Sequence, residues 1–95
     1  MREGASKTKL RKRYAGGVSP HVVSDAAAVA ACVAFANERR ILVEPACGAA
    51  LAALYGASVP AALAGRKCVV AEVCGGAVVD LPALQGWARD LGVAF

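Results

Sequence analysis

The sequence predicts an α/β unit with the order helix, short extended segment, helix, strand, helix. Two capped helical patterns and one valine-rich apolar run, residues 68–74, carry this prediction. A length of 95 residues corresponds to one domain at most. The hydrophobic content is 58%, but much of it is alanine, which buries little area per residue. We therefore expect a weakly stabilising core that packs against something larger.

The first helix is predicted over "DAAAVAACVAFANERR", directly after Ser24. Serine is a favourable N-cap residue, and Asp25 suits the positive end of the helix dipole. Arg39 and Arg40 suit the negative end. The residues that recur at helical spacing on one face are Val29, Cys32, Val33 and Ala36.

"ILVEP" is predicted to be extended, and Pro45 then opens a second helix that ends near Tyr55. Proline is tolerated in the first turn because the amide it lacks would be unpaired there. Gly48 inside this helix lowers the stability of the helix by about 1 kcal/mol relative to alanine. Because alanine would be the better helix former, we expect that another part of the protein approaches the backbone at this position. Gly56 is expected to end the helix in a left-handed conformation.

The second half of the chain predicts a turn, a strand and a third helix. Residues 58–65 read as a helical turn closed by Gly65, and the run 68–74 reads as a buried parallel strand interrupted by Glu72. Asp80 caps the last helix, which Gly92 ends; its predicted inward face comprises Leu84, Trp87, Ala88 and Leu91. One strand cannot form a sheet, so we expect its partners in another chain or in a missing part of this one.

The net charge of +4 resides in the first 17 residues, which hold six basic residues and one acidic residue. The remainder has five basic and six acidic residues, a charge of −1. Such a tail is typically solvated and disordered. A contact with nucleic acid or another acidic surface, and a targeting segment, are the alternatives. A nucleic-acid partner is not expected, because it would rest on the tail alone.

The cysteines, at positions 32, 47, 68 and 74, form no C-x-x-C pair, and no secretory signal is evident. We interpret them as reduced, mostly buried thiols of a cytoplasmic protein. His21 has no partners at metal-ligand spacing except Asp25, so no metal site is predicted. The uncharged stretch 45–65 is interpreted as a buried helix and turn rather than a membrane span, since it contains three glycines and two prolines.

The junction "EVCGGAV" is the candidate functional site. Cys74 ends the predicted strand, and two glycines precede the last helix. Ligands of open α/β sheets bind beyond the carboxyl ends of strands, where glycines let backbone amides approach them. A thiol there can act as a neutral hydrogen-bonding group, or as a nucleophile if a cationic neighbour lowers its pKa. A buried cysteine followed by an ordinary Gly-Gly turn is the alternative.

Three stretches carry a resemblance to a known family: "HVVSDAAAVAACVAFANERR", "ILVEPACGAALAALYG" and "VCGG". Together they cover about residues 21–93. They resemble the C-terminal segment of the L-serine dehydratase and L-threonine deaminase family, including the serine dehydratase-like proteins. The resemblance implies pyridoxal-phosphate enzymes of the tryptophan-synthase-β fold type, acting on small amino acids as homodimers. Residues 18–95 would then be part of a three-layer catalytic domain.

The same resemblance implies roles for the glycine junction. Cys74 would lie at the pyridine nitrogen of pyridoxal phosphate, and Gly75 and Gly76 would keep the backbone clear of the ring. A thiol does not hold that nitrogen charged as an aspartate would. Glu44, at the start of the neighbouring motif, would lie close to this site or act only as an exposed acid at a helix start.

The chain also departs from the family pattern. The family's lysine, which bonds covalently to the cofactor, sits in an S-x-K-x-R-G setting, and a glycine-rich loop binds the phosphate; neither is present in this sequence. Lys9 of "SKTKLRKR" and Lys67 lack that setting. We assign no catalytic residue and expect a fragment that is inactive alone. The competing hypothesis is a non-enzymatic interaction module, with its apolar faces at Leu51, Leu54, Val70 and Trp87.

Overall fold

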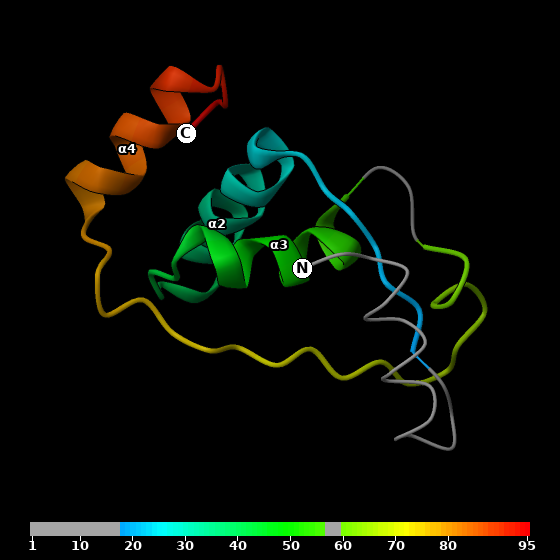
Figure 1. Cartoon of the computed structure of the whole chain (residues 1–95). Helices are drawn as coiled ribbons and strands as arrows, with labels where there is room; N and C mark the ends of the chain where they lie inside the picture. Colours follow the sequence, from blue (N-terminus) through cyan, green and yellow to red (C-terminus); the bar gives the residue numbers. More distant parts are fainter. Residues whose placement is uncertain (1–17, 57–59) are drawn as a thin grey trace.

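The computed structural model describes residues 18–56 and 60–95 and contains three helices within them (Figure 1). These are α2 (Asp25–Arg39), α3 (Pro45–Tyr55) and α4 (Leu81–Asp90). The predicted basic tail, residues 1–17, lies outside the described part. None of the helices described is both long and apolar enough to cross a membrane.

Helix α2 begins and ends as its sequence predicts. The Ala27 amide donates to Ser24 Oγ at 3.0 Å, which confirms Ser24 as the N-cap. The cap at the other end is Arg40, in the left-handed conformation with φ 59°, and its amide donates to the Ala36 carbonyl at 2.9 Å. This position usually favours glycine, so the turn here is formed at some conformational cost.

Helix α3 has the predicted bounds, with Pro45 in its first turn. The left-handed ending predicted at Gly56 is wrong: this residue has φ −68° and ψ 160°. Its amide still donates to the Ala52 carbonyl at 2.8 Å, and the chain then leaves the helix directly in an extended conformation. The turn over 61–65 ends at Gly65, as predicted, and this glycine has a positive φ of 73°.

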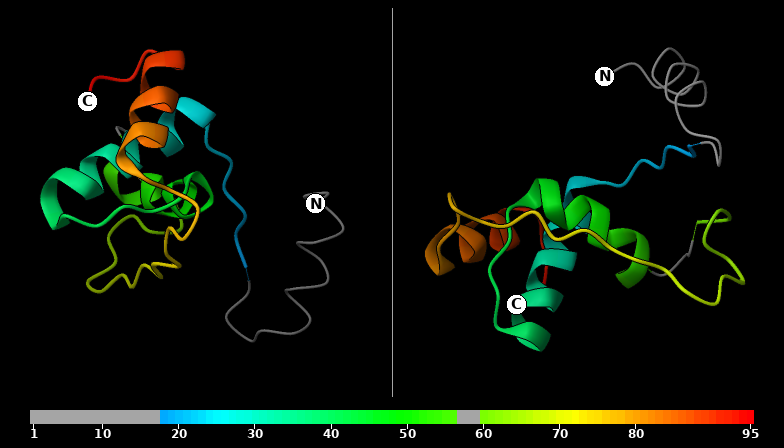
Figure 2. Two further views of the ribbon diagram at one scale, coloured as in Figure 1. Left: turned by 90° about the vertical axis from the view of Figure 1, so that its left-hand side faces the viewer. Right: turned by 90° about the horizontal axis from the view of Figure 1, so that it is seen from below.

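The strand predicted over 68–74 is absent from the described residues, which contain no strand at all. The valine-rich segment is extended, yet a strand also requires backbone hydrogen bonds to a neighbouring strand. The described part of the chain supplies no such neighbour. The segment instead follows α3 along the surface, from beyond its C-terminal end back to its N-terminal end (Figures 1 and 2). The described residues by themselves therefore do not form the predicted α/β fold.

Helix α4 is capped by Asp80, whose Oδ1 accepts from the Ala83 amide at 2.9 Å. Its end is formed by Gly92, with φ 69°, and by the Val93 amide, which donates to the Ala88 carbonyl at 2.7 Å. The cap at Asp80 and the end of the helix at Gly92 were both predicted. The predicted inward face is correct for its buried residues Leu84 and Ala88, but Leu91 is 40% exposed because it lies beyond the last helical turn.

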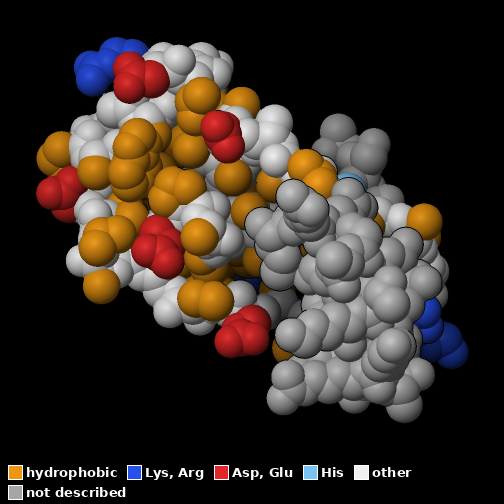
Figure 3. Space-filling model, in the orientation of Figure 1, with side chains coloured by type: hydrophobic (Ala, Val, Ile, Leu, Met, Phe, Trp, Pro, Cys, Tyr) orange, Lys and Arg blue, Asp and Glu red, His pale blue; other side chains and the backbone are white. Residues whose placement is uncertain are grey.

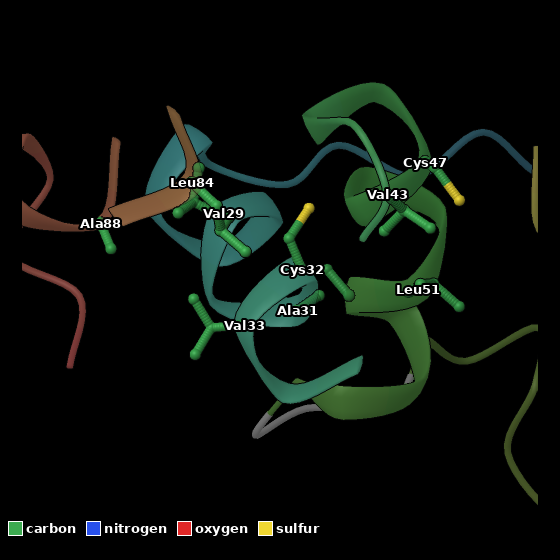
Figure 4. Packing of buried hydrophobic residues seen from close by; sticks show 10 residues of the cluster. Val29, Ala31, Cys32, Val33, Val43, Cys47, Leu51, Leu84 and Ala88 are labelled. Carbon is green, nitrogen blue, oxygen red and sulfur yellow. The ribbon is translucent and has the colours of Figure 1, made fainter. Parts of the chain in front are cut away.

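The core lies around α2, which packs against both α3 and α4. Figure 4 shows the side chains of α2 lying between those of the other two helices. The predicted apolar face of α2 is confirmed by the burial of Val29, Cys32 and Val33. The full buried cluster comprises Val29, Ala31, Cys32, Val33, Val43, Cys47, Leu51, Ala52, Leu84 and Ala88.

Candidate functional site

The backbone of Glu44 joins the two sequence motifs of the predicted site. Its amide donates to the Gly75 carbonyl at 3.0 Å, which links the start of α3 to the glycine junction. Its carbonyl accepts from the Cys47 and Gly48 amides at 2.9 and 3.0 Å, as expected at a helix N-terminus. The Cys32 thiol of α2 also contacts this carbonyl, at 3.6 Å. The backbone of this one residue therefore connects α2, α3 and the junction.

Gly48 is where α2 and α3 come closest. A Cβ atom added to Gly48 would lie 2.3 Å from the Ala28 carbonyl oxygen and 2.4 Å from Cys32 Sγ. Both distances are far below van der Waals contact, so only glycine fits between the helices as they are packed. The predicted close approach of another element to Gly48 is confirmed, and that element is α2.

The two glycines after Cys74 have different physical roles. Gly75 has φ 125°, a conformation that residues with a side chain rarely adopt, and a Cβ there would meet no atom within 4 Å. Gly76 is instead restricted by space, because a Cβ would lie 2.3 Å from the Leu42 carbonyl oxygen. The Gly76 carbonyl then accepts from Val79 at 3.0 Å and turns the chain toward α4.

The four cysteines divide into two classes. Cys32 and Cys47 are buried, whereas Cys68 and Cys74 are exposed. The prediction of mostly buried thiols is therefore wrong for the second pair, because the segment that carries them lies on the surface rather than inside a sheet. Cys74 thus offers an accessible thiol at the edge of the glycine junction.

The Cys32 thiol is held in its neutral form. Burial raises its pKa above the ordinary value of 9.0, the nearby Cys47 raises it further, and a hydrogen bond from the Gly48 amide opposes both effects. Sequence periodicity places Cys32 on the inner face of α2, but it does not reveal that this thiol meets the first turn of α3. The contact depends on how the two helices pack.

Because the pKa of Cys32 is raised on folding, the unfolded chain loses this proton first as the pH increases. The contribution to stability is present in full below pH 9.0 and is lost as the pH rises through the pKa of the folded state. We expect the free energy of unfolding to fall above pH 9 more steeply in the native chain than in Cys32→Ala. Urea titrations between pH 7 and 10.5 measure this slope. Equal slopes in both chains would contradict the assignment.

A polar contact that the sequence analysis missed joins the far ends of α2 and α3. The Tyr55 hydroxyl donates to Glu38 Oε2, and this hydrogen bond raises the pKa of Tyr55. The two residues are 17 positions apart, so no local sequence pattern signals the pairing.

Of the two lysines of the sequence analysis, Lys67 is exposed at the start of the extended segment, and Lys9 lies outside the described residues.

A separate cavity of about 370 Å³ opens between the N-terminal ends of α2 and α3 and the side of α4. Its lining is mainly apolar and does not include Cys74 or Gly75. The lining residues are Val23, Ser24, Asp25, Ala28, Val29, Pro45, Ala46, Ala49, Trp87 and Leu91. The glycine junction is therefore a surface feature, distinct from this cavity.

Comparison with known proteins identifies relatives of the chain. It is 42% identical over 96 residues to the L-serine dehydratase/L-threonine deaminase of Rattus norvegicus, covering 95% of the chain and 26% of the rat protein. The human protein of the same name is 38% identical over 96 residues, covering 95% of the chain and 29% of that protein. The L-serine dehydratase of Dictyostelium discoideum is 41% identical over 69 residues, covering 72% of the chain and 19% of that protein. No established family profile matches the chain.

Proposed function

Since the chain belongs to the L-serine dehydratase/L-threonine deaminase family and spans about a quarter of the length of its curated relatives, we propose that it is a segment of a pyridoxal-phosphate-dependent dehydratase. The intact enzyme would convert L-serine to pyruvate and ammonia, and L-threonine to 2-oxobutanoate and ammonia, as a homodimer. In this proposal the catalytic domain spans residues 18–95 and further chain that completes the site.

One observation carries the proposal: the hydrogen bond from the Glu44 amide to the Gly75 carbonyl. It holds together the "VEPACGAA" and "VCGG" motifs, the two stretches that carry the family resemblance. The two motifs are some 30 residues apart in the sequence. A likeness that came only from a similar content of helix-forming residues would not explain why they meet. This hydrogen bond joins two main-chain groups, so it does not involve the Glu44 side chain.

The residues of the junction fit one edge of pyridoxal phosphate. The Cys74 thiol is accessible and can exchange a hydrogen bond with a ring nitrogen. Gly75 adds no side chain beside it, and a Cβ there would meet open space. Pyridoxal phosphate, when bound, supplies the electron sink for removing the α-proton and the β-hydroxyl group. Among the described residues, nothing at the junction offers a lysine or a phosphate loop.

Cys74 would therefore position the cofactor ring rather than take a proton from the substrate. A thiol would not hold the ring nitrogen charged as an aspartate would, so the electron withdrawal stays modest. That environment favours loss of the β-hydroxyl group over other fates of the deprotonated substrate. Gly75 and Gly76 would keep the main chain from occupying the same space.

The proposal is tested in a chimaera in which this chain replaces the matching segment of the rat relative. We expect Cys74→Ala to lower the rate of pyruvate formation from L-serine at least about tenfold and to change the absorption spectrum of the bound cofactor. Cys68→Ala is the matched control, since Cys68 is also an exposed cysteine of the same segment. Identical rates and spectra for the two variants would overturn the role of Cys74.

The 95-residue chain alone should show no dehydratase activity, and added pyridoxal phosphate should give no absorption band that depends on Cys74. Activity of the bare chain that disappears on replacing Lys9 or Lys67 would contradict the proposal.

A non-enzymatic interaction module is the second candidate function. It is favoured by the exposure of Leu54 at 44% and of Val70 at 88%. A chimaera that folds but binds no cofactor would favour this second function.

A further inference from the structure

Gly76, the second glycine of the junction, lies against the chain segment that leads into α3. A Cβ atom added to Gly76 would lie 2.3 Å from the Leu42 carbonyl oxygen and 2.9 Å from both the Leu42 carbonyl carbon and the Val43 Cα atom. Non-bonded heavy atoms are ordinarily about 3.5–4.0 Å apart. All three neighbouring atoms belong to the main chain, so the rotation of a side chain could not make room for the added atom.

The backbone conformation of Gly76 does not itself require a glycine. The described glycines with positive φ are Gly65, Gly75 and Gly92, and Gly76 is not among them. Its φ angle is therefore one that residues with a side chain also adopt. What excludes a side chain at this position is the contact with the backbone of residues 42 and 43.

The segment 42–44 is the fixed side of this contact. Val43 has an exposed fraction of 0% and lies in the buried cluster (Figure 4). The Glu44 carbonyl accepts hydrogen bonds from two amides in the first turn of α3. The junction, by contrast, has Gly75 directly before position 76, and glycine is the residue with the widest choice of backbone conformations. A side chain at position 76 should therefore displace the junction rather than segment 42–44.

The displacement would be large enough to separate the two sequence motifs. Restoring an ordinary contact distance from 2.3 Å requires a shift of about 1 Å. The Glu44 amide and the Gly75 carbonyl oxygen are 3.0 Å apart, so a shift of this size would take them beyond hydrogen-bonding distance. Cys74 directly precedes Gly75 in the chain and would move with it.

From these contacts we infer that Gly76 is a positioning residue of the cofactor site. Because it has no side chain, it can lie against the Leu42 carbonyl group and thereby fix where Cys74 stands relative to the start of α3. The inference rests on the proposed function, in which Cys74 meets the pyridine nitrogen of pyridoxal phosphate. A misplacement of about 1 Å in an active site can lower the rate about 100-fold, so the exact seat of the junction matters.

Amide hydrogen exchange in the 95-residue chain, followed residue by residue by NMR, tests the contact without any cofactor. We expect the Glu44 amide to be protected in the native chain and to exchange at least about tenfold faster in Gly76→Ala, because its hydrogen bond to Gly75 is lost. The Val33 amide inside α2 should stay protected. Unchanged protection at Glu44, or loss of protection at both amides together, would overturn the inference.

Val78→Ala is the matched control in the turn that follows the junction. Exposed apolar side chains are frequent on the described part of the molecule, as the face drawn in Figure 3 shows. Val78 is 77% exposed, so shortening its side chain removes little packing. The exchange rate of the Glu44 amide should stay within about twofold of the native rate. A loss of protection as large as in Gly76→Ala would count against a specific role of position 76.

The consequence for the reaction is tested in the chimaera with the rat relative. Gly76→Ala should lower the rate of pyruvate formation from L-serine at least about tenfold and shift the absorption spectrum of the bound cofactor. If Gly76 acts through Cys74, the same substitution in a chimaera that already carries Cys74→Ala should change the rate less than about twofold. Equal effects with and without Cys74 would overturn the inference.

The two experiments also separate this inference from the proposed function. A Cys74→Ala chimaera with the native rate and spectrum would overturn the proposed role of Cys74, and with it the assignment of Gly76 to the cofactor site. Loss of protection at Glu44 in Gly76→Ala would still establish the contact with Leu42. Conversely, an active chimaera that depends on Cys74 but tolerates Gly76→Ala would overturn only the role of Gly76.

Discussion

Replacing Gly48 by alanine should lower the free energy of unfolding by about 2 kcal/mol, although alanine is the better helix former. On propensity alone the change would stabilise α3 by about 1 kcal/mol. The added Cβ, however, would lie 2.3 Å from the Ala28 carbonyl oxygen and 2.4 Å from Cys32 Sγ. Relieving this overlap requires α2 and α3 to separate, and overpacking of this kind typically costs 1–3 kcal/mol or more.

The matched control is Gly86→Ala in the middle of α4. There the nearest atom to an added Cβ is the end of the flexible Arg89 side chain, at 3.8 Å. The free energy of unfolding of this variant should therefore rise by up to about 1 kcal/mol, because alanine has the higher helix propensity. Urea denaturation of both chains, followed by circular dichroism, measures the difference. If both glycines respond with the same sign, the close contact between α2 and α3 is not what restricts position 48.

Truncating Leu84 to alanine should destabilise the chain by about 2–5 kcal/mol and release α4 from α2. Among the described residues, Leu84 is the largest fully buried side chain, with an exposed fraction of 0%. Removing it loses the transfer free energy of the buried methyl groups and leaves a cavity between the two helices. Because α4 contacts the rest of the core chiefly through α2, little else holds it in place.

Leu81→Ala is the control for this experiment, since Leu81 lies in the same helix and is 45% exposed. We expect its free energy of unfolding to change by less than about 0.5 kcal/mol. Trp87, half-buried on α4, reports the displacement through a red shift of its fluorescence in Leu84→Ala. A native spectrum and native stability in Leu84→Ala would show that α4 does not depend on this side chain.

Interactions within a few residues of each other were predictable from the sequence. The caps at Ser24 and Asp80, the place of Pro45 and the endings at Gly65 and Gly92 are all as predicted. Each depends on atoms three or four positions apart along one helix or turn. The family resemblance likewise came from contiguous stretches, and Cys74 and Gly75 remain the predicted cofactor-binding residues.

The positions of the helices, the caps at Ser24 and Asp80 and the family could therefore be inferred from contiguous stretches of sequence. Which segments meet depends on how the helices pack: Cys32 and Gly48 meet at the crossing of α2 and α3, and Glu44 meets Gly75 at the junction. The tertiary structure also decided that the run 68–74 stays an extended surface segment. A helix forms its hydrogen bonds within itself, whereas a strand needs a partner chain segment, so only the helices could form from local sequence.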